Sequence, residues 1–149
     1  MKQGELNYIS MSFSGCKKLK NISFPSNIMT TDLWGLPEGV TIRGWQNTQA
    51  KESAERAKGK FVSLGTIPPV ITGGRVKKII DKYQLRWNPS RGVSGYQVYT
   101  VSNTIADLKG SGNTTCFIKD IYEYDTIYIR AYRIVNGKKV YGKAKAVTI

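Results

Sequence analysis

The stretch that decides the fold is YIRAYRIVNGKKVYG, residues Tyr128–Gly142. It contains two apolar-rich runs joined by Asn136-Gly137, and both of these residues tolerate the positive φ that a two-residue type I′ turn requires. In the first run Ile127, Ile129 and Ala131 alternate with tyrosine and arginine, which predicts one buried face and one wet face. The stretch therefore predicts an antiparallel hairpin that closes an all-β domain.

Short runs of strand-forming residues precede and follow this hairpin. Tyr83, Leu85 and Trp87 alternate with polar residues, which predicts a strand with three large side chains facing inward. Cys116 and Ile118 are expected to be buried from a strand at residues 115–118. Further strands are expected at residues 70–71, 96–101 and 144–149, residues 106–113 are expected to form a polar loop, and residues 76–80 fit either a strand or a loop. Short strands with turn signals about every ten residues are typical of a β-sandwich.

The phrases LRWNP, GYQVY and TIYIRAYRIVNGKKVYG together resemble a fibronectin type III domain of the bacterial extracellular kind, over residues 67–149. In this resemblance Trp87 matches the family's core tryptophan and Tyr96 the tyrosine of its next strand. The spacing before Ala131 is unusual, so the family's corner tyrosine is Tyr124 or Tyr128, or is missing. No Arg-Gly-Asp occurs in the chain, so the integrin binding of some animal members is not implied.

The beginning of the chain has a different pattern. Residues 13–25, FSGCKKLKNISFP, place apolar residues at steps of three and then two, which suits a solenoid turn ending in a strand at residues 21–24. The phrase resembles a leucine-rich repeat of the BspA-like bacterial surface group. A strand at residues 39–44, a helix over residues 49–58 between Thr48 as N-cap and Gly59, and a strand at residues 61–62 resemble the unit that closes such arrays.

The domain boundary is predicted at residues 65–69, where Pro68 and Pro69 make a stiff, extended linker. We therefore expect a mostly β chain of two domains. Residues 1–66 would be a small α+β leucine-rich-repeat end with a C-terminal cap, and residues 67–149 a fibronectin type III-like β-sandwich. One repeat and a cap bury little apolar surface, so we expect residues 1–66 to be the tail of a longer solenoid. A missing N-terminal part would then explain why no signal peptide is found. Neither terminus carries an apolar run long enough to span a membrane.

The net charge of +13 is unevenly distributed. Residues 1–66 hold nine Lys and Arg against five Asp and Glu, whereas residues 67–149 hold fourteen against five. A strongly basic domain can bind anionic polymers or acidic surfaces, although a solubilising surface is the plainer interpretation. Nucleic acid is disfavoured because the basic residues do not gather on one helix or loop. Cys16 and Cys116 fit no zinc or redox spacing, and we expect two buried free thiols, with a disulfide as the alternative.

The chain contains no histidine. This removes Ser-His and Cys-His nucleophile pairs, the commonest general base, and most zinc and iron sites. Asp120, Glu123 and Asp125 are the candidate pair-forming carboxylates for glycosidase-type chemistry, but they fit a solvated loop better, and no glycine-rich phosphate loop is present. We therefore expect no enzyme activity, no cofactor and no metal.

Aromatic side chains next to cations can stack on sugars or other ligands. The possible ligand contacts on this ground are Trp34, Trp45, Tyr99, Tyr128, Arg130 and Tyr132. The plainer interpretation is that the tyrosines pair across the sheet and the tryptophans pack in a core. The expected function is a non-catalytic extracellular or cell-surface module for adhesion or protein–protein interaction. Its partner would be a protein or glycan on a cell surface, without membrane insertion, and the sandwich would be a spacer or auxiliary binder. The alternative is that the basic sandwich binds carbohydrate or an anionic cell-wall polymer.

Overall fold

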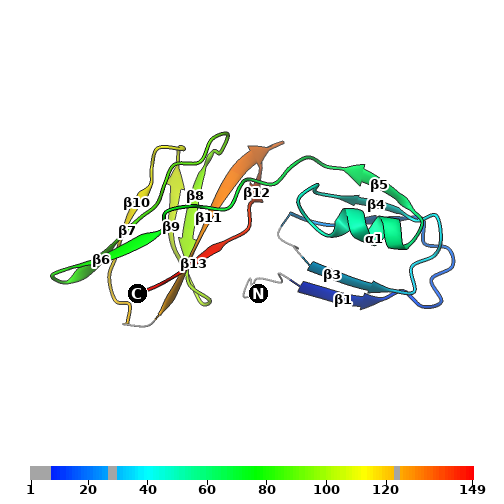
Figure 1. Cartoon of the computed structure of the whole chain (residues 1–149), viewed down its shortest axis with the longest axis horizontal. Helices are drawn as coiled ribbons and strands as arrows, with labels where there is room; N and C mark the ends of the chain where they lie inside the picture. The colour runs from blue at the N-terminus through cyan, green and yellow to red at the C-terminus, as the bar shows by residue number, and fades with distance from the viewer. Residues whose placement is uncertain (1–7, 27–29, 123–124) are drawn as a thin grey trace. The chain divides into compact units, whose positions relative to one another are not determined.

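The computed structural model describes residues 8–26, 30–122 and 125–149. The chain divides into two compact units, Glu5–Ile67 and Pro68–Ile149, which we call the coil unit and the sandwich unit. Nearly all of the regular structure is β-strand, and α1 (Ala50–Arg56) is the one helix among the described residues (Figure 1). The mostly β fold class predicted from the sequence is confirmed.

The coil unit is built from parallel strands that return to the same place after each winding of the chain. In one sheet β1 (Tyr8–Ser12) pairs with β3 (Thr30–Trp34). In the other, β4 (Thr41–Gly44) lies between β2 (Asn21–Ser23) and β5 (Lys60–Ser63), and all pairs are parallel. Asn21 pairs with Thr41, and Thr41 with Lys60, so the chain returns after 20 and then 19 residues. This regular return makes the unit a short solenoid.

Helix α1 takes the place of a strand in the last winding and covers the core. Its small residues Ala50 and Ala54 are buried against Phe24, Val40 and Ile42. The small residues of the helix therefore face the core. The close packing explains why: a Cβ added at Gly44 would collide with that of Ala50.

The ends of this helix differ from the sequence prediction. Gln49 occupies the N-cap position without a side-chain cap bond. The Thr48 hydroxyl lies one residue earlier, where it donates to the Trp45 carbonyl at 2.7 Å and accepts from the Ala50 N–H at 3.4 Å. At the other end Lys58, with φ of 47°, takes the left-handed conformation expected of Gly59. Gly59 is needed for another reason, since a Cβ there would collide with the Val40 carbonyl.

The prediction that both cysteines are buried is wrong for Cys16. This residue lies in the arc between β1 and β2, where successive turns carry the chain around the outside, and it is exposed. Cys116 is 7% exposed and packs in the sandwich core, where burial raises the pKa of its thiol. Both thiols are free.

The sandwich unit has two antiparallel sheets. One has the order β10-β7-β6, and the other has the order β12-β11-β8-β9 with β13 also paired to β11. The first sheet comprises β6 (Arg75–Ile79), β7 (Lys82–Arg86) and β10 (Thr115–Ile118). The second comprises β8 (Gly95–Tyr99), β9 (Thr104–Lys109), β11 (Thr126–Val135), β12 (Lys138–Tyr141) and β13 (Lys145–Thr148). One hydrophobic core collects residues from both sheets.

The hairpin predicted at Asn136-Gly137 is present between β11 and β12. The two turn residues have φ of 50° and 74°, as a type I′ turn requires, and Val135 pairs with Lys138. The sandwich interior contains Trp87 and Tyr96 side by side, with ring centroids 5.4 Å apart and planes at 69°. The Tyr96 hydroxyl accepts from the Ser90 N–H and donates to the Ser111 carbonyl, so its polar end is satisfied.

Three strand predictions need correction. Residues 70–71 are not a strand, although Ile71 is 1% exposed and belongs to the core. Residues 75–79 form a strand, which settles the open alternative for residues 76–80. The loop expected at residues 106–113 is wrong for residues 106–109, which belong to β9, whereas residues 110–113 lie outside the strands. Ile105, Ala106 and Leu108 pack partly against the core, and pairing with β8 outweighs the polar residues between them.

Candidate binding surface

Four of the six predicted contact residues come together on one outer face of the sandwich. The alternation along β11 turns Ile127, Ile129 and Ala131 into the core, each with 0% exposure. Tyr128, Arg130 and Tyr132 therefore point to the opposite side of the sheet. Tyr99 on the neighbouring strand β8 lies directly opposite Tyr128. We call this outer arrangement the tyrosine ladder; it comprises Gln97, Tyr99, Asp107, Tyr128, Arg130, Tyr132, Lys139 and Tyr141.

At one end of the ladder two tyrosines stack on each other. The ring centroids of Tyr99 and Tyr128 are 5.4 Å apart and the ring planes are 18° from parallel. The Arg130 guanidinium follows, with its central carbon 4.8 Å from the Tyr99 centroid and 3.9 Å from the Tyr141 centroid. A cation held against aromatic faces is attracted by their quadrupoles. The arginine on β11 therefore contacts aromatic side chains of two neighbouring strands, β8 and β12.

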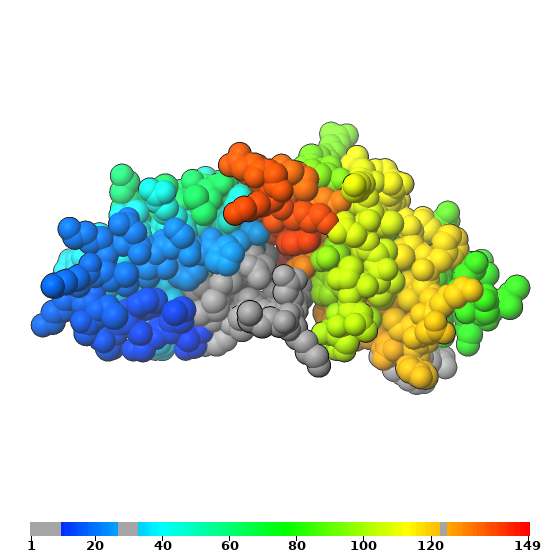
Figure 2. All heavy atoms as spheres, turned by 180° about the vertical axis from the view of Figure 1, so that it is seen from behind, coloured from blue at the N-terminus to red at the C-terminus, as the bar shows by residue number. Residues whose placement is uncertain are grey.

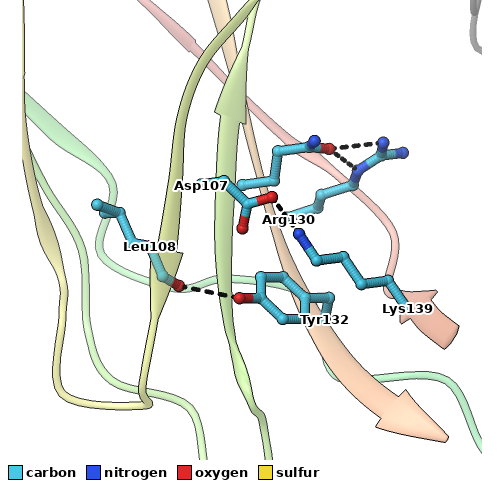
Figure 3. Close-up of polar contacts among 6 residues, drawn as sticks. Asp107, Leu108, Arg130, Tyr132 and Lys139 are labelled. Atoms are coloured by element: carbon cyan, nitrogen blue, oxygen red, sulfur yellow. Dashed lines mark hydrogen bonds and ion pairs between the residues drawn. The ribbon is translucent and has the colours of Figure 1, made fainter. Parts of the chain in front are cut away.

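The position of Arg130 is also set by a neutral partner. Its Nε and Nη2 atoms both donate to Gln97 Oε1, at 2.9 and 2.7 Å (Figure 3). Gln97 lies directly opposite Arg130 in the pairing of β8 with β11 and is 9% exposed. A buried amide oxygen needs a donor, and this arginine supplies it. The guanidinium is thus held by hydrogen bonds as well as by aromatic rings.

The other end of the ladder contains an ion pair above a buried tyrosine. Lys139 pairs with Asp107, and its Nζ lies 4.4 Å from the Tyr132 ring centroid (Figure 3). The Tyr132 hydroxyl donates to the Leu108 carbonyl at 3.4 Å. Burial, followed by the charge of Asp107, raises the pKa of Tyr132. Burial alone would lower the pKa of Lys139, but the hydrogen bond to Asp107 and the neighbouring tyrosines outweigh it and raise that pKa.

This geometry leaves some of the predicted contact residues with little surface that a ligand could reach. Tyr99 and Tyr132 were expected on a wet face, but they are only 6% and 2% exposed. They are covered because large side chains on neighbouring strands lie flat over one another, as cross-strand pairs do. Tyr128 and Arg130 remain half-buried. The cross-strand pairing offered as the plainer interpretation therefore describes most of the ladder. Tyr128 stacks on Tyr99 and Tyr124 lies outside the described residues, so the identity of the corner tyrosine stays a prediction.

The two tryptophans lie in the coil unit and differ in exposure. Trp34 ends β3 and is 61% exposed, so the expectation of core packing is wrong for it. Its neighbour Leu33 packs against the core, and successive strand residues face opposite sides. Trp45 is half-buried, with its ring against Gly65. Trp34 is thus the contact candidate with the most accessible surface.

Sequence reasoning missed the partners that fix the ladder. Gln97, Asp107 and Lys139 are ordinary polar residues in the sequence, and only the strand register brings them against the tyrosines and Arg130. These three partners could have been found only by aligning β8, β9, β11 and β12 in their correct register. Of the carboxylate candidates, Asp120 is exposed, Asp125 accepts from the Tyr122 N–H in a turn, and Glu123 lies outside the described residues. Within residues 8–26, 30–122 and 125–149 no three metal-ligating side chains come together.

Comparisons with known proteins give only distant structural likenesses. No protein-family model matches the chain, and a search of curated proteins found no match. Similar solved structures include the spore cortex lytic enzyme SleM of Clostridium perfringens, at 18% identity and a TM-score of 0.45 over 56% of this chain and 29% of that one. They also include a mutant named FN3tt, at 16% identity and a TM-score of 0.39, over 56% and 97% of the two chains. An FN3 domain of human collagen XX matches at 14% identity and 0.39, over 59% and 97%.

The described part of the chain has no helix of the length and hydropathy needed to span a membrane. The fold of the sandwich unit is given by its own strand order. Three strands, in the order β10-β7-β6, face a second sheet in which β11 and β8 are central. This is a fibronectin type III-like fold.

Proposed function

We propose that the chain is a non-catalytic module of the cell surface or extracellular space that serves adhesion or protein–protein contact. In this proposal the coil unit is the end of a BspA-like leucine-rich-repeat array, and the sandwich is a spacer or auxiliary binder. The phrase FSGCKKLKNISFP, the parallel strands, and the return of the chain after 20 and 19 residues support the repeat assignment. The absence of histidine from the sequence supports a role without acid–base chemistry.

The observation that carries the proposal is Trp34 on the outer surface of the β1–β3 sheet. It is 61% exposed, although tryptophan is among the residues with most to gain from burial. Solenoids present extended faces to their partners, and exposed tryptophans are frequent energetic centres of protein interfaces. We therefore place the main contact with a partner protein on this face.

The test is adhesion of the whole chain to cells. Beads coated with the chain are expected to be retained on a cell layer at moderate ionic strength, because apolar contact is little affected by salt. Trp34→Ala should reduce retention about tenfold or more, as hot-spot truncations do, whereas the matched change Tyr122→Ala, at an 81% exposed aromatic residue of the sandwich, should leave it unchanged. Retention that is equal for both variants, or that disappears at moderate salt, would contradict the proposed contact.

A further inference from the structure

The outer face of the β10-β7-β6 sheet is basic. The inward row Val76, Leu85 and Cys116 packs in the core, so the residues on either side of it face outward. These strands contain no Asp or Glu. We call the outward side chains the cationic face; they are Arg75, Lys77, Ile79, Lys82, Gln84, Arg86, Thr115 and Phe117. Figure 2 shows the β6–β7 hairpin, in green, at the surface of the molecule.

Two arginines in this face lie directly opposite each other. Arg75 pairs with Arg86 across β6 and β7, and both are exposed. Like charges in directly opposed positions of an antiparallel pair destabilise the sheet. The acidic residue of the adjoining turn, Asp81, forms its ion pair with Lys119 at 3.3 Å, and that bond lowers the pKa of Asp81. Among the described residues no carboxylate forms an ion pair with either arginine.

The remaining residues extend this charge along the sheet. Lys77 is two positions beyond Arg75 on the same strand, which is about 6.8 Å in an antiparallel sheet. The face contains one exposed aromatic ring, Phe117, which is 54% exposed. The Lys82 ammonium lies over it, 4.9 Å from its centroid. The face thus presents several cations and a single exposed aromatic ring.

We propose that the cationic face binds a linear polyol-phosphate polymer, with successive phosphodiesters on the Arg75–Arg86 pair and on Lys77. An anion between the two guanidiniums converts their repulsion into charge-assisted hydrogen bonds. The two-residue step along β6 is close to the separation of successive phosphates in an extended chain with short polyol links. This inference rests on the proposed function, in which the sandwich is an auxiliary binder, and it assigns that binder a ligand class and a surface.

The scarcity of aromatic rings on this face argues against other polyanions. Proteins that bind single-stranded nucleic acid stack successive bases on several aromatic side chains, and here Phe117 is the one exposed ring, with the Lys82 ammonium 4.9 Å from its centroid. Sugar rings of an acidic polysaccharide would use the same kind of platform. A slender polymer, whose recognition is carried by its phosphates alone, needs no such ring.

The experiment measures binding of the whole chain to synthetic poly(glycerol phosphate) by titration at low and moderate ionic strength. Comparison probes of equal charge are oligodeoxythymidylate and polygalacturonate. We expect the tightest binding to poly(glycerol phosphate), with affinity falling steeply as salt is added, because counterions are released from the polymer. R75Q/R86Q should weaken binding about tenfold or more. Lys77→Gln, a second and milder variant, should weaken it and make the salt dependence shallower.

The matched control is K109Q/K138Q, which removes two charges from exposed positions of the other sheet. It should bind as the unchanged chain does, apart from a small effect of net charge. The proposal is overturned if the control loses as much affinity as R75Q/R86Q, if no binding occurs at low salt, or if either comparison probe binds as tightly as poly(glycerol phosphate). Bead retention in the adhesion assay is read separately. If retention persists without polymer binding, this inference fails alone; if polymer binding persists without retention, the proposed adhesion fails.

Discussion

The two outer faces of the sandwich contain similar residues but satisfy their charges differently. In the tyrosine ladder, Arg130 is held by Gln97 and by aromatic rings, and Lys139 by Asp107. On the cationic face, Arg75 is opposed by Arg86. In the tyrosine ladder the cations form contacts within the protein, and these contacts contribute to its stability. On the cationic face the side chains of Arg75 and Arg86 are exposed to solvent, where their mutual repulsion weakens the sheet and where an anion can bind them.

The largest expected effect comes from Gly95 beneath the ladder. Gly95 pairs with Tyr132, and a Cβ there would lie 2.6 Å from the tyrosine hydroxyl oxygen and collide with the Leu108 carbonyl. Because the carbonyl belongs to the paired strand β9, the clash cannot be relieved by a side-chain rotation. Gly95→Ala should lower the free energy of unfolding by about 3 kcal/mol, measured by urea denaturation. Gly112→Ala, at a loop position with open space around it, is the control; equal losses would disprove the close packing over Gly95.

The next effect concerns Arg130. Arg130→Ala removes the cation between two rings and leaves the buried Gln97 amide oxygen without its donor. We expect a loss of about 2 kcal/mol in the free energy of unfolding. Arg91→Ala, at an exposed loop residue, should be nearly neutral. If the two variants are equally stable, the ladder contributes no more than an ordinary surface.

The two faces should also respond to opposite ends of the pH scale. The pKa values of Tyr132 and Lys139 are raised from 10.0 and 10.5. Their contribution to the free energy of unfolding is therefore present below pH 10 and is lost as pH rises through the folded-state values. The pKa of Asp81 is lowered from 3.8, so its small contribution is present above that value and lost as pH falls. Thermal unfolding from pH 3 to pH 11 measures both. Lys139→Met should make the melting temperature depend less on pH at alkaline pH, and Asp81→Asn should do so at acid pH. An effect of Lys139→Met confined to acid pH would contradict this assignment.

The smallest expected effect has the opposite sign. Arg86→Gln removes the repulsion with Arg75 and should raise the free energy of unfolding by about 0.5 kcal/mol at low salt. Added salt should reduce the difference because it screens exposed charges. Differential scanning calorimetry at two ionic strengths is the measurement. A destabilised variant would mean that Arg86 has a stabilising contact in the folded protein.

Local turn chemistry and alternation made much of the sandwich predictable. Asn136-Gly137 placed the hairpin, and the period of two in β11 identified Ile127, Ile129 and Ala131 as buried. The strand β9 was missed because Asp107 and Lys109, close to Gly110, were interpreted as loop residues, although residues 106–109 alternate between apolar and polar as a half-buried strand does. Its place depends on pairing with β8, which is a tertiary effect that local sequence does not contain.

The candidate surface was harder to predict for a related reason. The exposed or buried state of Tyr132 depends on Lys139 and Asp107, which come from two other strands. Trp34 looked like a core residue by its size, but its exposure follows from the register that turns Leu33 inward. Residue type indicates what a side chain can do, whereas strand register decides whether a ligand can reach it.

The stacked pair of Tyr99 and Tyr128 has a practical consequence for optical spectroscopy. Two phenol rings with centroids 5.4 Å apart and nearly parallel planes couple electronically, so their near-ultraviolet circular dichroism depends on the register of β8 and β11. In a W34F/W45F variant the remaining tryptophan is the buried Trp87, which absorbs at longer wavelength and reports on the interior of the same sandwich. Loosening of the outer face and melting of the core can therefore be followed as two separate signals from one unlabelled sample.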